Sequence, residues 1–286
     1  MTRVIIMIGE QMTCLAIHDI SCLGKCSLTA ALPILSAAGV SVGILPTALL
    51  SNQTGGLNLY TRLDLTEEMG RITDVWSRTG ARFDAAFSGY LGSARQAALV
   101  RDAVDRFVEK DGLFLCDPAM ADNGALYSGF DADFVPAMRS LCARADVLTP
   151  NVTEAMLLLG KDADASFDES VLYALRERFE LAGCVVTGVS DGDQIGSACL
   201  DAGGVSYAMT PRLAGMFHST GDVFASALTG CLLRGLPLAE SCRAASLFTY
   251  RCIVETVENG GDSRYGLCFE PCLGTLIEEL EEKQIG

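Results

Sequence analysis

The chain has 286 residues, and its 21 Lys and Arg side chains against 36 Asp and Glu give a formal net charge of −15. Half of the residues are hydrophobic and only 20% are charged, which excludes a disordered or fibrous protein. The length fits one large α/β domain or two small ones. Because nucleic acids and anionic membranes repel a negative surface, we expect neither as a partner.

Twelve cysteines could indicate disulfides or a metal site, but their pattern favours neither. They are spread over the whole chain, no two form a Cys-x-x-Cys pair, and only His18 and His218 could join them as imidazole ligands. Many of them lie in apolar runs, as buried thiols do. We therefore expect reduced cysteines and a cytoplasmic protein.

The N-terminus carries a short apolar run at residues 4–8, which is too short for a signal-peptide core or a membrane span. Met12 directly precedes the first convincing strand. We expect residues 1–11 to be an extension that an upstream start codon adds, and residues 12–286 to form a single domain.

Short apolar runs alternate with longer amphipathic segments in the first half of the chain. Pro33 should kink the first helix. A polar loop at residues 51–56, rather than another helix, follows the second strand. The predicted elements of this half are strands at 14–17, 40–45, 83–87 and 113–116 and helices at 27–38, 66–78 and 94–109.

The second half continues the alternation and ends in helices. Two apolar runs flank a turn and predict a pair of neighbouring strands, and from residue 221 onward the pattern is helical. The predicted elements are strands at 147–148, 184–186, 195–200 and 205–209 and helices at 152–159, 169–181, 221–233, 239–257 and 273–282.

Apolar strands that alternate with helices indicate an α/β fold with a mostly parallel sheet covered on both faces. In such sheets, ligands bind beyond the carboxyl ends of the strands. Polar residues gather at five predicted strand ends: His18-Asp19, Ser88-Gly89, Asp117-Pro118, Thr149-Pro150-Asn151 and Thr187-Gly188.

The segment HSTGDVFA, from His218 to Ala225, is the sharpest chemical motif. A turn of small residues opens a helix whose free N–H groups and dipole can bind an anion. Asp222, in the first turn, could accept a proton from an attacking hydroxyl. Phosphoryl transfer needs these two parts close together. The alternative is ordinary capping, because an Asp near a helix N-terminus is common.

Two further segments allow both a structural and a functional interpretation. The prolines after Asp117 and Thr149 could simply end strands, and Asn151 with Glu154 could form a capping pair. Equally, these carboxylates and the amide could position hydrated magnesium near phosphates. The sequence leaves both interpretations open.

The STGD turn, together with SNQTG (51–55), SGYLGS (88–93), DPAM (117–120) and TPNVTE (149–154), resembles the pyridoxal and pyridoxamine kinases of the ribokinase superfamily, over about residues 14–257. STGD is shared across the superfamily, whereas the other segments point to its vitamin B6 branch. The resemblance implies a ribokinase-like three-layer sandwich, a homodimer, and ATP- and Mg²⁺-dependent phosphorylation of the 5′-hydroxymethyl group of pyridoxal, pyridoxamine or pyridoxine. It leaves a requirement for a monovalent cation open.

The resemblance also implies roles for single residues. Asp222 would deprotonate the 5′-hydroxymethyl group. The anion hole would consist of backbone N–H groups of Ser219, Thr220 and Gly221. The residues on the ATP and Mg²⁺ side would be Asp117, Thr149, Asn151, Glu154 and Thr187, with Asp117 and Glu154 reaching the metal through water. The residues around the pyridine ring would be Asp19, Thr47, Ser51, Thr54, Gly55 and Tyr90.

Four positions depart from the pattern of these kinases. Ser219 replaces the usual glycine, and Gln53 stands where a histidine is common. Thr187 replaces a lysine of some relatives, so one expected phosphate-binding cation is missing. Asp19 occupies a position that is serine in some relatives. An acid there would favour the cationic amine of pyridoxamine over the aldehyde of pyridoxal.

Several other polar or aromatic residues have two interpretations. His18 could contact substrate or be a hydrogen-bonded structural histidine, and His218 could contact nucleotide or pack within its loop. We expect Lys25 and Arg95 on the solvated surface, and Trp76 in the packing of its helix.

The competing functions lie inside and outside the superfamily. A hydroxymethylpyrimidine kinase of thiamine synthesis typically has a Gly-rich turn after the first strand and a Cys in the anion turn, and this sequence has neither. Two further candidates are another sugar or nucleoside kinase and a non-catalytic protein that binds B6 or nucleotide. No catalytic triad or Gly-x-Gly-x-x-Gly follows the first strand, so hydrolases and dinucleotide enzymes have little support.

Overall fold

The computed structural model describes residues 11–57, 59–130 and 133–285. The expected extension, residues 1–11, lies outside the described residues except for Gln11. The described chain is built around an eight-stranded sheet with the order β13-β12-β11-β10-β7-β6-β1-β3. These strands are β13 Gly204–Pro211, β12 Gln194–Asp201, β11 Gly183–Asp191, β10 Val147–Leu148, β7 Val108–Cys116, β6 Phe83–Ser88, β1 Thr13–Ile17 and β3 Ser41–Ile44.

Six neighbouring strands pair in parallel, in the order β11-β10-β7-β6-β1-β3. Strand β12 is antiparallel to both of its neighbours, β11 and β13. The mostly parallel sheet and the predicted strand pair β12–β13 are therefore confirmed. The segments that cross the centre of the sheet, such as Phe114–Cys116 of β7 and Cys184–Val186 of β11, are apolar because both faces of the sheet are covered.

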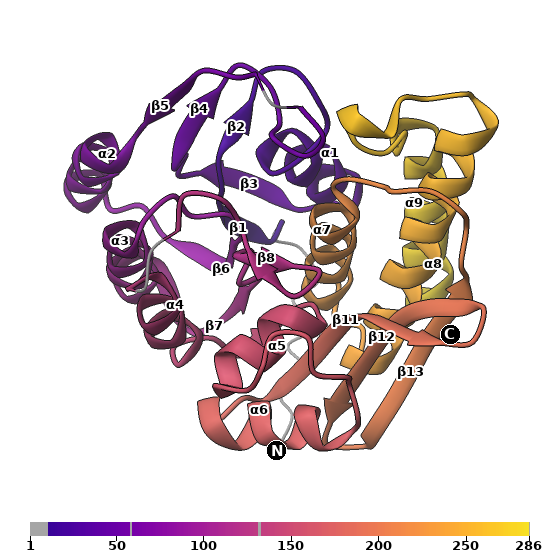
Figure 1. The fold of residues 1–286 in the computed structure, drawn as a ribbon. Coiled ribbons are helices and arrows are strands. Elements are labelled where there is room, and N and C mark those ends of the chain that lie inside the picture. The colour runs from indigo at the N-terminus through magenta and orange to yellow at the C-terminus, as the bar shows by residue number, and fades with distance from the viewer. Residues whose placement is uncertain (1–10, 58, 131–132, 286) are drawn as a thin grey trace.

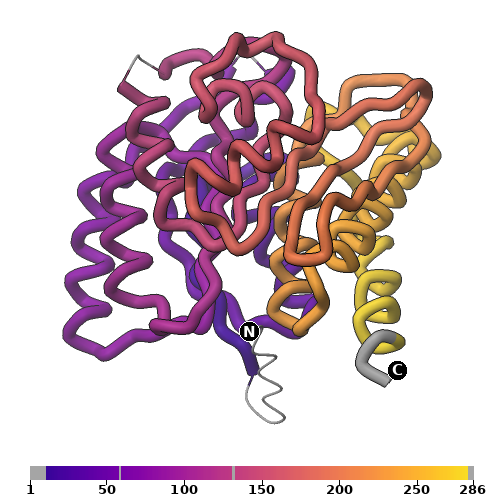
Figure 2. The backbone as a smooth tube through the Cα atoms, turned by 90° about the horizontal axis from the view of Figure 1, so that it is seen from below, coloured from indigo at the N-terminus to yellow at the C-terminus, as the bar shows by residue number. Residues whose placement is uncertain are grey.

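Helices cover the two faces as separate layers (Figures 1 and 2). Leu15 and Ile17 point into one layer and Cys14 into the other, as the alternation of side chains along a strand requires. The first layer contains α2 Thr66–Thr79, α3 Ala94–Phe107, α4 Phe134–Cys142, α5 Val152–Leu159 and α6 Ser170–Phe179. The second contains α1 Leu28–Ala37, α7 Thr220–Leu233, α8 Leu238–Glu258 and α9 Leu273–Ile285. This confirms the three-layer sandwich.

Two small sheets were not predicted. Strands β2 Ile20–Ser21, β4 Ala48–Leu50 and β5 Arg62–Asp64 form one of them, which begins where β1 ends and lies at the top of Figure 1. Strands β8 Ala121–Asp122 and β9 Ala125–Leu126 form the other. Strands of two or three residues are too short to show the alternation from which strands are predicted.

Most predicted elements agree with the structure to within a residue or two. The boundary between α3 and β7 was wrong: the helix ends at Phe107, and the strand begins at Val108 because Val108 pairs with Phe83. Strand β11 also extends beyond the prediction, because it continues as an antiparallel pair with β12. Pro33 lies inside α1.

The side chains that were expected to be structural lie where the prediction put them. Trp76 packs edge-on against Phe83 and Phe107, with ring centroids 5.8 and 5.6 Å apart. Ten of the twelve cysteines are buried, Cys22 is exposed and Cys268 is half-buried. None of the helices in the described ranges is long and apolar enough to cross a membrane.

Candidate active site

The carboxyl ends of four neighbouring strands carry predicted polar clusters. His18 and Asp19 follow β1, Ser88 ends β6, Asp117 follows β7 and Thr149 follows β10. Because β1, β6, β7 and β10 are neighbours and parallel, these residues lie along one edge of the sheet. Helix α7 begins at the same edge, since the charge of Asp222 raises the pKa of Asp117 and the charge of Asp19 raises that of Asp222.

The turn before α7 has the geometry of an anion site. Ser219 is the N-cap residue, with φ 66° and ψ 12°, and no described side chain caps the helix. The first N–H groups of this fourteen-residue helix, at Thr220, Gly221 and Asp222, therefore point out of its positive end without a side-chain acceptor. A phosphoryl oxygen would satisfy them.

Asp222 has the properties of a general base. Its side chain is half-buried, and burial raises its pKa to about 7. The backbone N–H of Ser27 donates to the carboxylate and lowers the pKa, while the charge of Asp19 raises it. A carboxyl with a pKa near the working pH can both take and release a proton.

Ser27, which the sequence analysis missed, lies between two acids. It precedes α1 and has φ 49° and ψ −128°, a positive-φ conformation outside the left-handed helical region that a non-glycine residue adopts at a cost of about 1–3 kcal/mol. This conformation directs its N–H to Asp222 and its hydroxyl to Asp19. No pattern in the sequence signals such a conformation, because it depends on the two distant carboxylates.

Asp19 is a buried acid in the same part of the site. It is 4% exposed, and burial raises its pKa. The hydroxyl of Ser21 donates to Asp19 at 3.3 Å, and Ser27 donates a second hydrogen bond. Arg62 lowers the pKa of Asp19 by its charge but forms its ion pair with Asp64, at 3.2 Å.

Glu154 and Asn151 form the capping pair that the sequence allowed. The Asn151 side chain accepts from the N–H of Glu154 and the Glu154 side chain from the N–H of Asn151, both at 2.9 Å. The second carboxylate oxygen of Glu154 accepts from Met120 at 2.9 Å and Ala121 at 3.3 Å. Glu154 thus holds the segment after β7 against α5, and burial raises its pKa to about 7.

Asp117 is the carboxylate that best fits a magnesium ligand. It is 8% exposed, and burial together with the charges of Glu154 and Asp222 raises its pKa well above its usual range. A divalent cation beside these three acids would reverse that effect, and carboxylate oxygens are ligands that Mg²⁺ prefers. Among the described residues, no three His, Cys, Asp or Glu side chains gather as a metal-ligand cluster.

The other residues predicted for the nucleotide side also come together. Thr149 is buried, and its hydroxyl has no hydrogen-bond partner in the described chain. Thr187 forms a β-bridge with Asn151, and its N–H donates to the carbonyl of Pro150 at 2.9 Å. The pairing of β11 with β12 is irregular directly after Thr187, where Gly188 has φ 72°.

The residues predicted for the pyridine pocket divide into buried and accessible ones. Thr47 is fully buried, and its hydroxyl donates to the carbonyl of Tyr90 at 3.3 Å, so it holds the backbone of Tyr90 in place. Ser51 accepts from the N–H of Thr61 at 2.9 Å. Thr54 is exposed, and a Cβ at Gly55 would lie 2.5 Å from Nδ1 of His218, so this loop packs on the anion turn.

The two histidines differ in exposure: His18 is fully buried, whereas His218 is half-buried directly before the anion turn. His18 is fully buried, packs edge-on against Phe87 at 4.4 Å, and has no hydrogen-bond partner among the described residues. The prediction of a hydrogen-bonded structural histidine was therefore wrong about the hydrogen bond, because neither ring nitrogen of His18 has a partner among the described residues and the ring packs against Phe87. Burial lowers its pKa to about 3. His218 packs against Gly55 and Gly56 of the loop at residues 51–56, rather than within its own loop.

The two cations lie on the surface, as expected. Lys25 pairs with Glu270 at 2.7 Å, and Arg95 pairs with Glu67. The side chains of both acids are at least half exposed. Neither cation contacts the anion turn in the structure.

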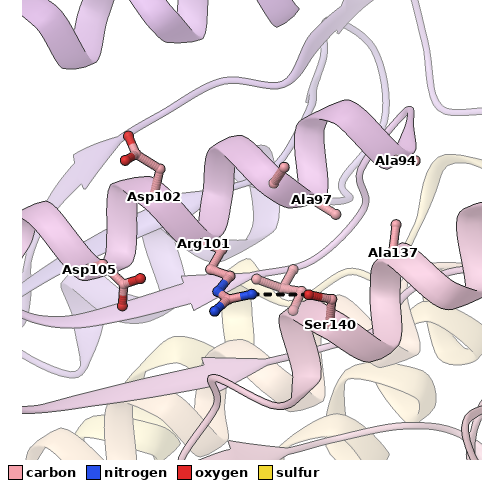
Figure 3. A pocket seen from close by; sticks show the side chains of 9 residues that line it. Ala94, Ala97, Arg101, Asp102, Asp105, Ala137 and Ser140 are labelled. Atoms are coloured by element: carbon pink, nitrogen blue, oxygen red, sulfur yellow. Dashed lines mark hydrogen bonds between the residues drawn. The ribbon is translucent and has the colours of Figure 1, made fainter.

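A hollow of about 320 Å³ lies away from the strand ends, between α3 and α4 (Figure 3). Four of its nine lining residues are alanines, and Arg101 reaches across it to donate to Ser140 at 3.2 Å. It contains none of the predicted site residues, so the candidate active site is the strand-end cluster.

Comparison with known proteins supports one family. The family model described as phosphomethylpyrimidine kinase matches residues 29–265. The pyridoxine/pyridoxal/pyridoxamine kinase of Bordetella avium is 30% identical over 235 residues, which cover 79% of this chain and 79% of the relative.

Two solved structures extend the likeness to the fold. Pyridoxal kinase from Lactobacillus plantarum is 36% identical with a TM-score of 0.89, covering 96% of this chain and 99% of that chain. Pyridoxal kinase from Leishmania donovani, in complex with ADP and pyridoxamine, is 25% identical with a TM-score of 0.76, covering 95% and 96%. The chain therefore belongs to the phosphomethylpyrimidine kinase family and, within it, to the pyridoxal kinases of the ribokinase-like superfamily.

Proposed function

We propose that the protein transfers the terminal phosphoryl group of ATP to the 5′-hydroxymethyl group of a vitamin B6 vitamer. The observation that carries this proposal is the position of Asp222, an acid with a pKa of about 7, in the first turn of a helix whose N-terminus no described side chain caps. A base and an anion site so close together suit phosphoryl transfer to an alcohol. The names of the relatives supply the B6 vitamer as the acceptor.

The chain's own residues would carry the transfer in two ways. Asp222 takes the proton as the O–H bond of the alcohol breaks and its oxygen forms a bond to the terminal phosphorus of ATP. The bond between that phosphorus and the bridging oxygen breaks, and ADP leaves. The N–H groups of Thr220, Gly221 and Asp222 meanwhile stabilise the charge on the transferring group.

Magnesium would be held beside Asp117, with Thr149, Asn151 and Thr187 on the same side. When bound, Mg²⁺ neutralises charge on the phosphate oxygens. Asp117 suits this role because its carboxylate is buried near two other acids, Glu154 and Asp222, and no described cation balances their negative charge. Glu154 contributes by orienting the segment at Met120 and Ala121, since its oxygens accept backbone N–H groups.

The proposal includes a preference for pyridoxamine. On the pyridine ring, the hydroxymethyl group and the substituent that distinguishes the vitamers are on neighbouring carbons. Asp19 is close enough to Asp222 for its charge to act there. With the alcohol at Asp222, the aminomethyl group would lie near Asp19, and the buried carboxylate would favour its ammonium.

We also propose that residues 12–286 act as one catalytic unit in a cytoplasmic homodimer. Apolar side chains of the small sheet and its loop are exposed, namely Leu49, Leu59, Tyr60 and Leu63. Exposed apolar groups that lie together support an interface with a second copy of the chain.

The test is phosphorylation of each vitamer and of hydroxymethylpyrimidine by MgATP, with wild type, Asp222→Asn and Asp146→Asn. Removing the base should lower kcat at least ~10²-fold. The control Asp146, which accepts from the N–H of Phe114 at 2.7 Å, lies away from the site and should retain activity. Unchanged kcat in Asp222→Asn would refute the mechanism. Turnover of the pyrimidine alone would favour the thiamine-pathway kinase, and turnover of no alcohol the non-catalytic binding protein.

A further inference from the structure

Gln53 is a buried side chain between three loops that meet at the active site. It is 4% exposed, and it belongs to the loop at residues 51–56. Its backbone N–H donates to the carbonyl of Leu23 at 3.0 Å, and a Cβ at Gly24 would lie 3.1 Å from its Cγ. Its side chain reaches the two other loops, at Ser219 and Arg264.

The hydrogen bonds fix which way the amide faces. Nε2 donates to the backbone carbonyl of Arg264, a group that can only accept. Oε1 therefore faces Ser219, and the Ser219 hydroxyl must donate to it, at 3.1 Å. The carbonyl of Arg264 and the hydroxyl of Ser219 together therefore determine the orientation of the Gln53 amide.

The far end of this connection is firmly held. Asp262 accepts from the Arg264 backbone N–H at 3.0 Å and from its guanidinium at 2.9 Å. The hydroxyl of Ser263 donates to the carbonyl of Met216 at 2.7 Å, so the loop that holds Gln53 is also tied to the segment before Ser219. Gln53 is consequently anchored, on the side away from the turn, to a loop with hydrogen bonds of its own.

Ser219 needs such support because of its backbone. Its φ of 66° places a side chain with a Cβ in the left-handed region, which glycine adopts freely and serine does not. The same φ directs the following N–H groups out of the end of α7. Without an anchor, relaxation of Ser219 toward a commoner conformation would turn these N–H groups away from the anion.

We infer that Gln53 is a positioning residue, which holds Ser219 in the left-handed conformation that the anion turn requires. It acts through the Ser219 hydroxyl and touches neither the phosphate nor the acceptor. This inference rests on the proposed function of the turn. It also gives a physical reason for the joint presence of glutamine at 53 and serine at 219, which lie 166 residues apart in the sequence.

The test compares Gln53→Met in two backgrounds. Methionine keeps the length and volume of the side chain and removes both hydrogen bonds. In the Ser219 background, kcat/KM for MgATP should fall at least ~10-fold, because the N–H groups are misplaced. In the Ser219→Gly background, the same change should cost less than about twofold, because glycine adopts a positive φ without help.

The matched control is Gln96→Met. Gln96 is also a fully buried amide, bonded to Thr47 and to the N–H of Gly92, but it has no contact with the turn. Activity lost there reflects general destabilisation or displacement of Thr47 in the predicted pyridine pocket, and in either case Ser219→Gly should not restore it. If Gln53→Met fails to fold, Ser219→Ala tests the same bond from the other side, since it keeps the Cβ and removes the hydroxyl.

Three results would overturn the inference: wild-type kcat/KM in Gln53→Met, an equal loss in both backgrounds, or unchanged kcat/KM in Ser219→Ala. Calorimetric binding of MgATP to the same variants separates this inference from the proposed function. If no vitamer is phosphorylated but MgATP binding is weakened by Gln53→Met and restored by Ser219→Gly, the proposed reaction fails and the positioning role stands.

Discussion

Individual acids in the site serve different purposes that their chemistry alone does not distinguish. Asp222 and Asp19 meet at Ser27, where one accepts the N–H and the other the hydroxyl. Glu154 instead uses both oxygens on backbone N–H groups. The sequence predicted all three as site residues, but only the hydrogen bonds separate a supporting acid from one that can face a ligand.

Asp19 should determine which vitamer the enzyme prefers. Changing Asp19 to Asn removes the negative charge, so kcat/KM for pyridoxamine should fall at least ~10-fold relative to pyridoxine, since hydrogen bonds between charged groups are the stronger ones. Steady-state kinetics with both vitamers measure the ratio. Asp84→Asn, at the opposite edge of the sheet where Asp84 binds Thr13 at 2.7 Å, should leave it unchanged. An unaltered ratio in Asp19→Asn would contradict the proposed preference.

Among the helices, α5 and α7 begin in opposite ways, and each beginning matches the role proposed for it. Helix α5 has its N-terminus closed by the Asn151–Glu154 capping box, whereas no described side chain caps α7. A capped terminus stabilises the fold, and an open one leaves N–H groups for a ligand. The local sequences TPNVTE and HSTGD predicted where both helices begin, but they left capping and ligand binding open at each, and only the structure distinguishes the two.

Removal of the α5 cap tests whether this helix also orders the nucleotide side. Asn151→Ala should lower stability by about 1 kcal/mol, or the melting temperature by roughly 2–4 °C. It should also raise KM for ATP, because Asn151 donates to the carbonyl of Ala121 at 2.7 Å and bridges to Thr187.

Ser93→Ala provides the comparison, because Ser93 caps α3 by accepting from the N–H of Gln96. Its melting temperature should fall similarly with KM for ATP unchanged. Equal KM values for the two variants would show that the cap of α5 is only structural.

Over the entire chain, most of the described acidic side chains are exposed, whereas a few at the candidate site lie where burial opposes ionisation. Burial raises the pKa values of Asp117, Glu154 and Asp222, the last two to about 7. The native state therefore holds these protons more tightly than the unfolded chain does. The free energy of unfolding accordingly falls as pH rises from the ordinary pKa of these acids, about 4, through about 7.

Denaturation by urea at pH 5 and pH 8 measures this effect. The buried acids should lower stability at pH 8, whereas the lowered pKa of His18 acts in the opposite direction. Relative to wild type, Asp117→Asn should therefore lose less stability on going from pH 5 to pH 8. The exposed Asp111, changed to Asn, should leave this loss as in wild type. If Asp117→Asn loses as much stability as wild type between pH 5 and pH 8, or more, then burial does not raise the pKa of Asp117.

What the sequence determined is local. The alternation of apolar strands and amphipathic helices specified the layered α/β fold, because each period depends on neighbouring residues. The strand-end clusters and the HSTGD turn specified the edge at which the candidate site lies. The short strands β2, β4 and β5 were missed, because pairing with partners rather than any pattern of their own makes them strands.

Only the tertiary structure decided which distant residues act on one another. It places Ser27 between Asp19 and Asp222, leaves His18 buried without a polar partner among the described residues, and joins Gln53 to Ser219. Hydrogen bonds and pKa shifts depend on distances of a few ångströms in space. Residues far apart along the chain reach these distances only when the whole sheet and its helices have packed.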